Sequence, residues 1–215
     1  MHPVVSENFF DWSMKFEGYV LWPYLDVKGL VTIGVGNLID PVSAAASLPF
    51  VLADGSPASR DKICADWANL KKHQGLAKYH YNAAAAFTQI RLTELSVRQL
   101  VTSKLSANWA FMRAHYFPHA DEWPAAAQLA VSSMAWAVGA GFPTIFKNFT
   151  HFAQLADWAD SDECCAINAK GNAGVIPRNV ADKALLLYAS NPDNDPETLP
   201  MQDGVIMMPE IEIVA

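Results

Sequence analysis

The sequence has few cysteines and no long apolar run. Its three cysteines, Cys64, Cys164 and Cys165, are an odd number with two members adjacent. This pattern excludes the disulfide framework of a small secreted domain, and free thiols are expected. No stretch approaches the roughly 20 apolar residues of a membrane span, so membrane insertion is not expected. The first twenty residues mix charged with apolar side chains, so they do not form the apolar core of a signal peptide.

Basic residues are also scarce. Fifteen Lys and Arg stand against 22 Asp and Glu, which gives a formal net charge of -7 without a basic block. Nucleic-acid binding depends strongly on phosphate contacts and is therefore not expected. His115 and His119 have the spacing of a helical metal pair, but Pro118 disrupts the helix that would align them, and no third ligand is evident. We expect neither a metal nor an organic cofactor.

The chain contains 215 residues, of which 52% are hydrophobic, enough for one substantial core in a compact domain with two lobes. The patterning predicts an α+β protein that is mostly helical. A short hairpin is expected over residues 24–35, and residues 77–87 are compatible with a helix or with a small-residue packing surface. Helices are expected over residues 7–17, after the N-cap Ser59, from residue 93, from Pro124 to Val138, over 146–158 and over 177–188.

The segment "EGYVLWPYLDVKGLVTIGVG" (residues 17–36) places one carboxylate directly after an apolar helix. At the C-terminal end of that helix the macrodipole disfavours the charge of Glu17. The aromatic residues Phe16, Trp22 and Tyr24 can also remove water from it. Both effects favour the protonated form, so Glu17 is a candidate proton donor.

The hairpin that follows carries Asp26 and Thr32. A three-residue loop over residues 28–30 would set Asp26 opposite Thr32 on one face, whereas a two-residue loop would send the two side chains to opposite faces. If the two act together, the loop is odd-numbered or bulged. Gly34 and Gly36 would then leave room for a bulky ligand near the backbone.

The same segment resembles the active-site segment of the phage-type, T4-lysozyme-like muramidases, which occur among phage endolysins and bacterial cell-wall-cleaving effectors. The family signature is Glu, eight residues, Asp or Cys, five residues, Thr, and then Ile-Gly-x-Gly. Glu17, Asp26, Thr32 and residues 33–36 match every one of these positions. Two later segments, "MAWAVGAGF" (134–142) and "GVIPRNVADKALL" (174–186), are similar to the cleft-lining and arginine-presenting helices of the family.

The resemblance implies a lysozyme-like fold with a small antiparallel sheet lobe, a helical lobe and a cleft between them. It places the catalytic domain at residues 1–190, with an enlarged excursion over 38–92 that adds about thirty residues to the compact members of the family. Residues 191–215 are expected to form an extended tail with four prolines, six acidic residues and no Lys or Arg, whose last apolar residues pack on the body.

The implied activity is hydrolysis of the β-1,4 bond between N-acetylmuramic acid and N-acetylglucosamine in peptidoglycan, with inversion. Glu17 would be the acid and Asp26 the base, and Thr32 would help to hold the attacking water. Substrate-binding positions are expected at Gly36, Leu38, Trp136 and Arg178. Arg178 would orient Glu17 but oppose its protonation, and a structural ion pair is an equal alternative for it. Trp136 is equally compatible with the core.

Several features leave alternatives open. Asn37 replaces the histidine that many members have after the Gly-x-Gly motif, and Trp136-Ala137 replaces an aromatic-amide pair. A catalytically silent glycan-binding domain and a lytic transglycosylase remain alternatives, although Asp26 and Thr32 argue against the second. Without a signal peptide, the protein is expected to be made in the cytoplasm and to reach the wall through a holin or a secretion apparatus. An effector would also have an immunity protein as its partner, and the negative charge favours an effector slightly.

Overall fold

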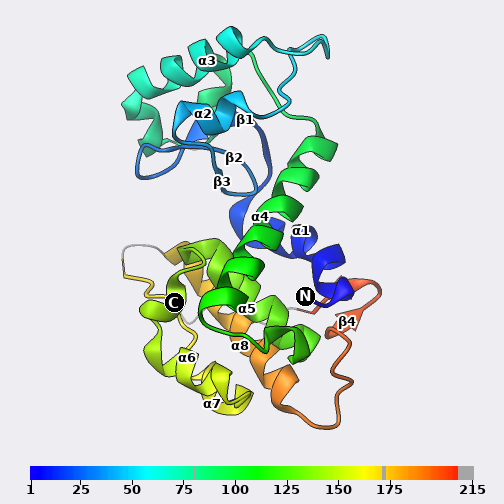
Figure 1. The fold of residues 1–215 in the computed structure, drawn as a ribbon. Coiled ribbons are helices and arrows are strands. Elements are labelled where there is room, and N and C mark those ends of the chain that lie inside the picture. The colour runs from blue at the N-terminus through cyan, green and yellow to red at the C-terminus, as the bar shows by residue number, and fades with distance from the viewer. Residues whose placement is uncertain (80, 171–172, 208–215) are drawn as a thin grey trace. The chain divides into compact units, whose positions relative to one another are not determined.

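The structure, a computed structural model, describes residues 1–79, 81–170 and 173–207 (Figure 1). It is a mostly helical α+β protein with a three-stranded antiparallel sheet near the N-terminus, which confirms the predicted class. The chain divides into two compact units. We call Glu17–Val101 the sheet unit, and Met1–Phe16 together with the chain from Thr102 onward the helical unit.

The sheet unit begins with a meander whose strands follow chain order in the sheet. Its core is apolar because β-branched and aliphatic side chains such as Val20, Val31 and Ile33 are fully buried on these strands. The elements of this unit are β1 (Val20–Leu25), β2 (Val31–Gly34), β3 (Asn37–Leu38), α2 (Val42–Ala46), α3 (Arg60–Lys72) and the 3-10 helices η1 (Gln74–Lys78) and η2 (Tyr81–Phe87).

The excursion after the sheet is ordered in the described residues. The hydroxyl of Ser59 accepts a hydrogen bond from the Lys62 backbone N–H, which confirms Ser59 as the N-cap of α3. Val51 forms backbone hydrogen bonds with Arg91 and so closes the excursion at its base. Residues 77–87, for which the sequence is compatible with a helix or with a packing surface, contain the end of η1 and all of η2.

The helical unit is built around α5 (Ala125–Val138), in which every residue from Ala125 to Trp136 is buried. Alanine and serine dominate this stretch, and their small side chains allow α8 (Ile176–Ser190) to pack closely beside it (Figure 1). The other elements of this unit are α1 (Pro3–Glu17) up to Phe16, the later part of α4 (Glu94–His115), η3 (Ala120–Glu122), η4 (Phe142–Thr144), α6 (Lys147–Gln154), α7 (Trp158–Asp162), η5 (Ala173–Val175), β4 (Met201–Gln202) and β5 (Val205–Ile206).

One predicted helix, over residues 146–158, is wrong in its extent. The helical conformation is interrupted at Ala156, which has a φ of 55°. The next helix, α7, begins after Asp157, whose side chain accepts a hydrogen bond from the Asp160 N–H. A residue in the left-handed region ends an α-helix because it cannot continue the right-handed hydrogen-bond pattern. The result is two short helices, α6 and α7, in place of one.

The part of the C-terminal segment that the structure describes is folded onto the helical unit. The Ala125 N–H donates to the carbonyl of Pro196 at 2.7 Å, and Leu199 and Ile206 are buried. The last apolar residues of the tail, beyond Met207, lie outside the described residues. Among the described helices, none has the length and apolar character needed to cross a membrane.

Candidate functional site

The hairpin of β1 and β2 sets the orientation of two candidate catalytic residues. Tyr24 pairs with Thr32, and the Asp26 N–H donates to the Leu30 carbonyl at 2.9 Å, so the loop is the three residues 27–29. The predicted loop over 28–30, with Asp26 directly opposite Thr32, is therefore wrong by one pair. The loop is nevertheless odd-numbered, which is the condition stated above for Asp26 and Thr32 to act together, and alternation along the strands places Asp26, Tyr24 and Thr32 on one face.

This face continues across the sheet. Thr32 also pairs with Leu38 on β3, so Tyr24, Thr32 and Leu38 form one row over the three strands. Thr32 is 5% exposed, whereas Leu38 is 51% exposed. Leu38 therefore presents an apolar side chain at the open end of the row, where it can contact a ligand.

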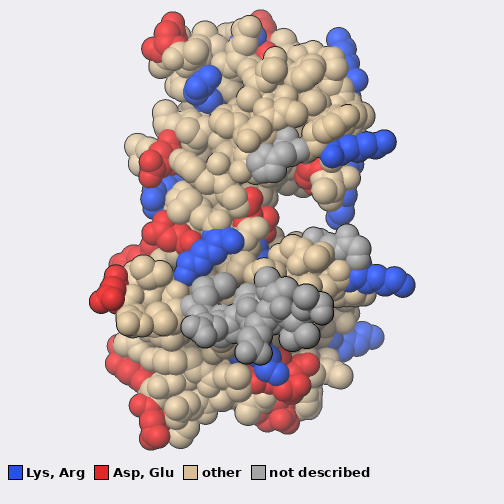
Figure 2. All heavy atoms as spheres, turned by 180° about the vertical axis from the view of Figure 1, so that it is seen from behind, with Lys and Arg blue, Asp and Glu red and all other residues tan. Residues whose placement is uncertain are grey.

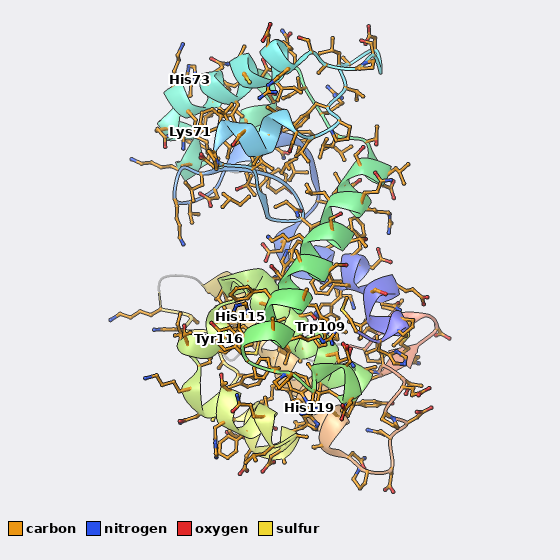
Figure 3. All side chains as sticks on the ribbon, viewed as in Figure 1. Lys71, His73, Trp109, His115, Tyr116 and His119 are labelled. Atoms are coloured by element: carbon orange, nitrogen blue, oxygen red, sulfur yellow. The ribbon has the colours of Figure 1, made fainter. Side chains whose placement is uncertain are left out.

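The carboxyl group of Asp26 is held by its own loop. Its Oδ1 accepts hydrogen bonds from the N–H groups of Lys28 at 2.8 Å and Leu30 at 2.9 Å. The loop is fixed in turn by Lys71 of α3, labelled in Figure 3, which donates from Nζ to the Gly29 carbonyl at 2.9 Å and to Asp40 Oδ2 at 2.7 Å. Within the described residues Asp26 Oδ2 has no hydrogen-bond partner, so this oxygen can accept a proton from a water molecule.

The hydroxyl of Thr32 has a defined direction. Its Oγ1 donates to the Leu30 carbonyl at 3.2 Å. A hydroxyl whose proton is used in this way keeps its lone pairs for accepting. Thr32 and Asp26 can therefore accept the two protons of one water molecule, which leaves a lone pair of that water free to attack.

Glu17 is the last residue of α1, and Gly18 follows it with a φ of 72°. The Glu17 carboxyl group is seated against Gly36: a Cβ built on Gly36 would lie 2.9 Å from Glu17 Oε2 and 3.2 Å from Cδ. At Gly34 the corresponding position is occupied by Val97, at 2.9 Å. The space predicted for a ligand at Gly34 and Gly36 is therefore filled by side chains of the sheet unit. Val97 fills it at Gly34, and the candidate acid Glu17 fills it at Gly36.

Replacing Gly36 by alanine should therefore displace Glu17. The φ of 70° adds a backbone cost of about 1 to 2 kcal/mol for a residue with a Cβ. We expect a lower melting temperature, and, if Glu17 is the proton donor that the sequence predicts, at least about tenfold less glycan cleavage, since small displacements of a catalytic group are costly. Gly55→Ala is the matched control, because its φ is 83° and nothing lies within 4 Å of the new Cβ. Equal activity in the two variants would contradict this role for Gly36.

Tyr24 lies close to both candidate carboxylates. Burial, followed by the negative charges of Glu17 and Asp26, raises the pKa of Tyr24 above its ordinary value. The phenol therefore stays neutral over the working pH range of any glycosidase. The charges of both candidate carboxyl groups therefore act on the same phenol.

Trp136 and Arg178 belong to the helical unit. Trp136 is 5% exposed, its ring lies 5.1 Å from that of Phe9, and the ammonium group of Lys104 lies 4.2 Å from its ring centre. This burial favours the core alternative over sugar contact for Trp136.

Arg178 is 2% exposed and has structural partners in its own unit. It donates from Nη1 to the carbonyl and the hydroxyl of Ser133, both at 3.1 Å. Its guanidinium carbon lies 4.7 Å from the ring centre of Phe16, which fits a cation–π contact. Arg178 thus contributes to the packing of α8 on α5, whatever further role it has.

One turn after Arg178 on α8 lies Asp182, a carboxyl group that is 1% exposed. Burial raises the pKa of Asp182 to about 7, and the charge of Arg178 and the hydroxyl of Ser133 only partly oppose this effect. The sequence carried a faint signal for this residue, an acid four positions after an arginine in the apolar run "RNVADKALL".

The protonated form of Asp182 is favoured by folding, so its contribution to stability is greatest at low pH. It falls by about 1.4 kcal/mol for each pH unit between about pH 4 and pH 7 as the unfolded chain loses this proton first. We expect Asp182→Asn to remove this dependence. The difference in unfolding free energy, variant minus parent, should therefore be larger at pH 8 than at pH 5. Urea unfolding at both pH values measures this, with exposed Asp193→Asn as control. An identical pH dependence of Asp182→Asn and the parent would contradict the assignment.

The two histidines with metal-pair spacing, His115 and His119, do not lie on one helix. The helix α4 ends at His115, and His119 lies beyond Pro118 with its Nδ1 3.2 Å from Glu122 (Figure 3). In the described ranges no group of three or more His, Cys, Asp or Glu side chains could hold a metal ion. On the face shown in Figure 2, Lys and Arg side chains are dispersed among acidic and uncharged residues.

Comparison of the chain with protein-family models and with curated proteins gave no match. The functional interpretation therefore depends on the residues themselves and on their geometry in the sheet unit.

Proposed function

We propose that the protein is a muramidase with a lysozyme-like, two-lobed fold, which hydrolyses the β-1,4 bond between N-acetylmuramic acid and N-acetylglucosamine in peptidoglycan. The observation that carries this proposal is geometric: the Glu17 carboxyl group lies against Gly36, and Asp26 and Thr32 lie on one face of the hairpin in the same unit. Glycoside hydrolysis requires two carboxyl groups in different environments, one to protonate the leaving oxygen and one to direct water.

The two carboxyl groups are held in different ways. Glu17 lies at the end of α1 with its carboxyl group against Gly36. Asp26 is held by two backbone N–H groups and keeps Oδ2 for a water molecule. In the proposed reaction Glu17 donates the proton to the leaving oxygen, and Asp26 together with Thr32 positions the water. We expect about 6.5 to 9.5 Å between the two carboxyl groups, the separation typical of an inverting enzyme.

The proposed substrate, the glycan strand of peptidoglycan, also sets the proposed place of action. The protein would be made in the cytoplasm and delivered to the cell wall by a holin or a secretion apparatus. As a delivered effector it would be neutralised by an immunity protein in the producing cell. Neither nucleic acid nor insertion into a membrane is part of this proposal.

The proposal is tested with purified, dye-labelled peptidoglycan sacculi. We expect the folded protein to release soluble labelled fragments, and a heat-inactivated sample to release none. Binding to sacculi without release would instead support a silent glycan-binding domain, and neither binding nor release would contradict the assignment of peptidoglycan as substrate.

A further inference from the structure

The excursion brings an aromatic residue to Gly18, the residue that follows the candidate acid Glu17. The 3-10 helix η2 packs on β1, where the indole N–H of Trp22 donates to the backbone carbonyl of Tyr81 at 3.1 Å. Further along η2, Ala84 is buried and the ring of Phe87 lies 4.6 Å from that of His73. These contacts hold η2 in place within the sheet unit.

The side chain of Tyr81 lies beside Gly18 and Tyr24. A Cβ built on Gly18 would lie 3.7 Å from Tyr81 Cε1 and 3.9 Å from its hydroxyl oxygen. The ring centre of Tyr81 lies 5.9 Å from that of Tyr24. Because Gly18 directly follows Glu17, and because Tyr24 lies near both carboxylates, the phenol of Tyr81 borders the site on the side of the acid.

The Tyr81 side chain also has the chemical character of a sugar contact. Its ring is partly exposed, offering an apolar face together with a hydroxyl that both donates and accepts. A pyranose ring presents the complementary combination, an apolar C–H face bordered by hydroxyl and N-acetyl groups.

We propose that Tyr81 is a specificity-determining residue that binds the N-acetylated sugar lying next to Glu17. This inference rests on the proposed function and extends it, because it assigns a substrate contact to the excursion over residues 38–92. The contact is made by the side chain, while the backbone of the same residue anchors η2 to Trp22.

The test measures binding of a tetrasaccharide of alternating N-acetylglucosamine and N-acetylmuramic acid by calorimetry, in a Glu17→Gln background that does not turn it over. We expect Tyr81→Ala to weaken binding about three- to tenfold, the range for one aromatic contact. In the active protein the same change should raise KM by a similar factor with little effect on kcat, since it removes binding shared by the ground state and the transition state. Tyr81→Phe separates the ring from the hydroxyl and should keep most of the affinity.

Tyr79→Ala is the matched control, because Tyr79 lies two residues away, is 69% exposed and should not affect binding. Unchanged affinity in Tyr81→Ala, or an equal loss in Tyr79→Ala, would overturn the inference. If Tyr81→Ala melts below the parent, Tyr81→Leu keeps an apolar side chain there, and parent-like affinity in that variant would also overturn it. Failure of the proposed function is distinguishable, because the tetrasaccharide would then neither bind nor be cleaved with Tyr81 in place.

Discussion

Replacement of Glu17 by glutamine is expected to lower glycan cleavage by about 10² to 10⁴-fold, the usual contribution of a general acid or base. Glutamine keeps the shape of the side chain against Gly36 but has no acidic proton to transfer to the leaving oxygen. The melting temperature should be no lower than that of the parent. The change removes a carboxylate from the C-terminal end of α1, and catalytic groups are commonly retained at a cost to stability.

The matched control is Glu7→Gln, which changes an exposed glutamate in the same helix. This variant should keep full activity, because Glu7 lies about three helical turns before Glu17. Activity is measured as initial release of fragments from sacculi and stability by thermal unfolding. A Glu17→Gln variant that retains activity and melts several degrees lower would show that Glu17 is a structural residue.

The second large effect concerns Asp26. Asparagine at this position keeps an oxygen to accept from the N–H groups of Lys28 and Leu30, so the loop should keep its shape. It cannot take a proton from water, and we expect a loss of about 10² to 10⁴-fold in cleavage rate. Asp54→Asn is the matched control, since Asp54 Oδ1 accepts from Ser56 N–H in a similar exposed turn. Near-parent activity of Asp26→Asn would contradict a chemical role for Asp26.

The proposed roles of Glu17 and Asp26 also determine the stereochemistry of the product. If Asp26 directs water while Glu17 protonates the leaving oxygen, one displacement occurs and the new reducing end first appears as the α-anomer. A direct attack by Asp26 would involve two displacements and give the β-anomer. NMR spectra recorded before mutarotation distinguish the two, and the β-anomer appearing first would make Asp26 a nucleophile. The accepting lone pairs of Thr32 favour the water route.

Local sequence signals predicted the elements that depend on short-range chemistry. Ser59 was identified as an N-cap because a hydroxyl directly before a helix can accept a hydrogen bond from a backbone N–H of its first turn. Glu17 was placed at the end of α1 because Gly18 can adopt a positive φ. The common face of Asp26 and Thr32 followed from alternation along a strand once the loop was taken as odd-numbered.

The features that the sequence missed depend on contacts between distant segments. The hairpin loop lies at residues 27–29, one residue earlier than predicted. Asp26 and Leu30 close this loop, through the backbone and through the Asp26 side chain, which accepts from the Leu30 N–H. The position of Tyr81 beside Gly18 depends on a bond to Trp22, 59 residues away. The burial of Asp182 follows from the packing of α8 on α5, which no pattern within residues 174–186 specifies.

Mass spectrometry of the fragments released from purified peptidoglycan tests the central claim most directly. Water delivered by Asp26 and Thr32 leaves a reducing N-acetylmuramic acid end on every fragment, and this is the product we expect. A transglycosylase, which needs the acid but no water, would leave 1,6-anhydro-N-acetylmuramic ends. Anhydro ends from the parent protein, or no fragments at all, would contradict the assignment of this chain as a hydrolytic muramidase.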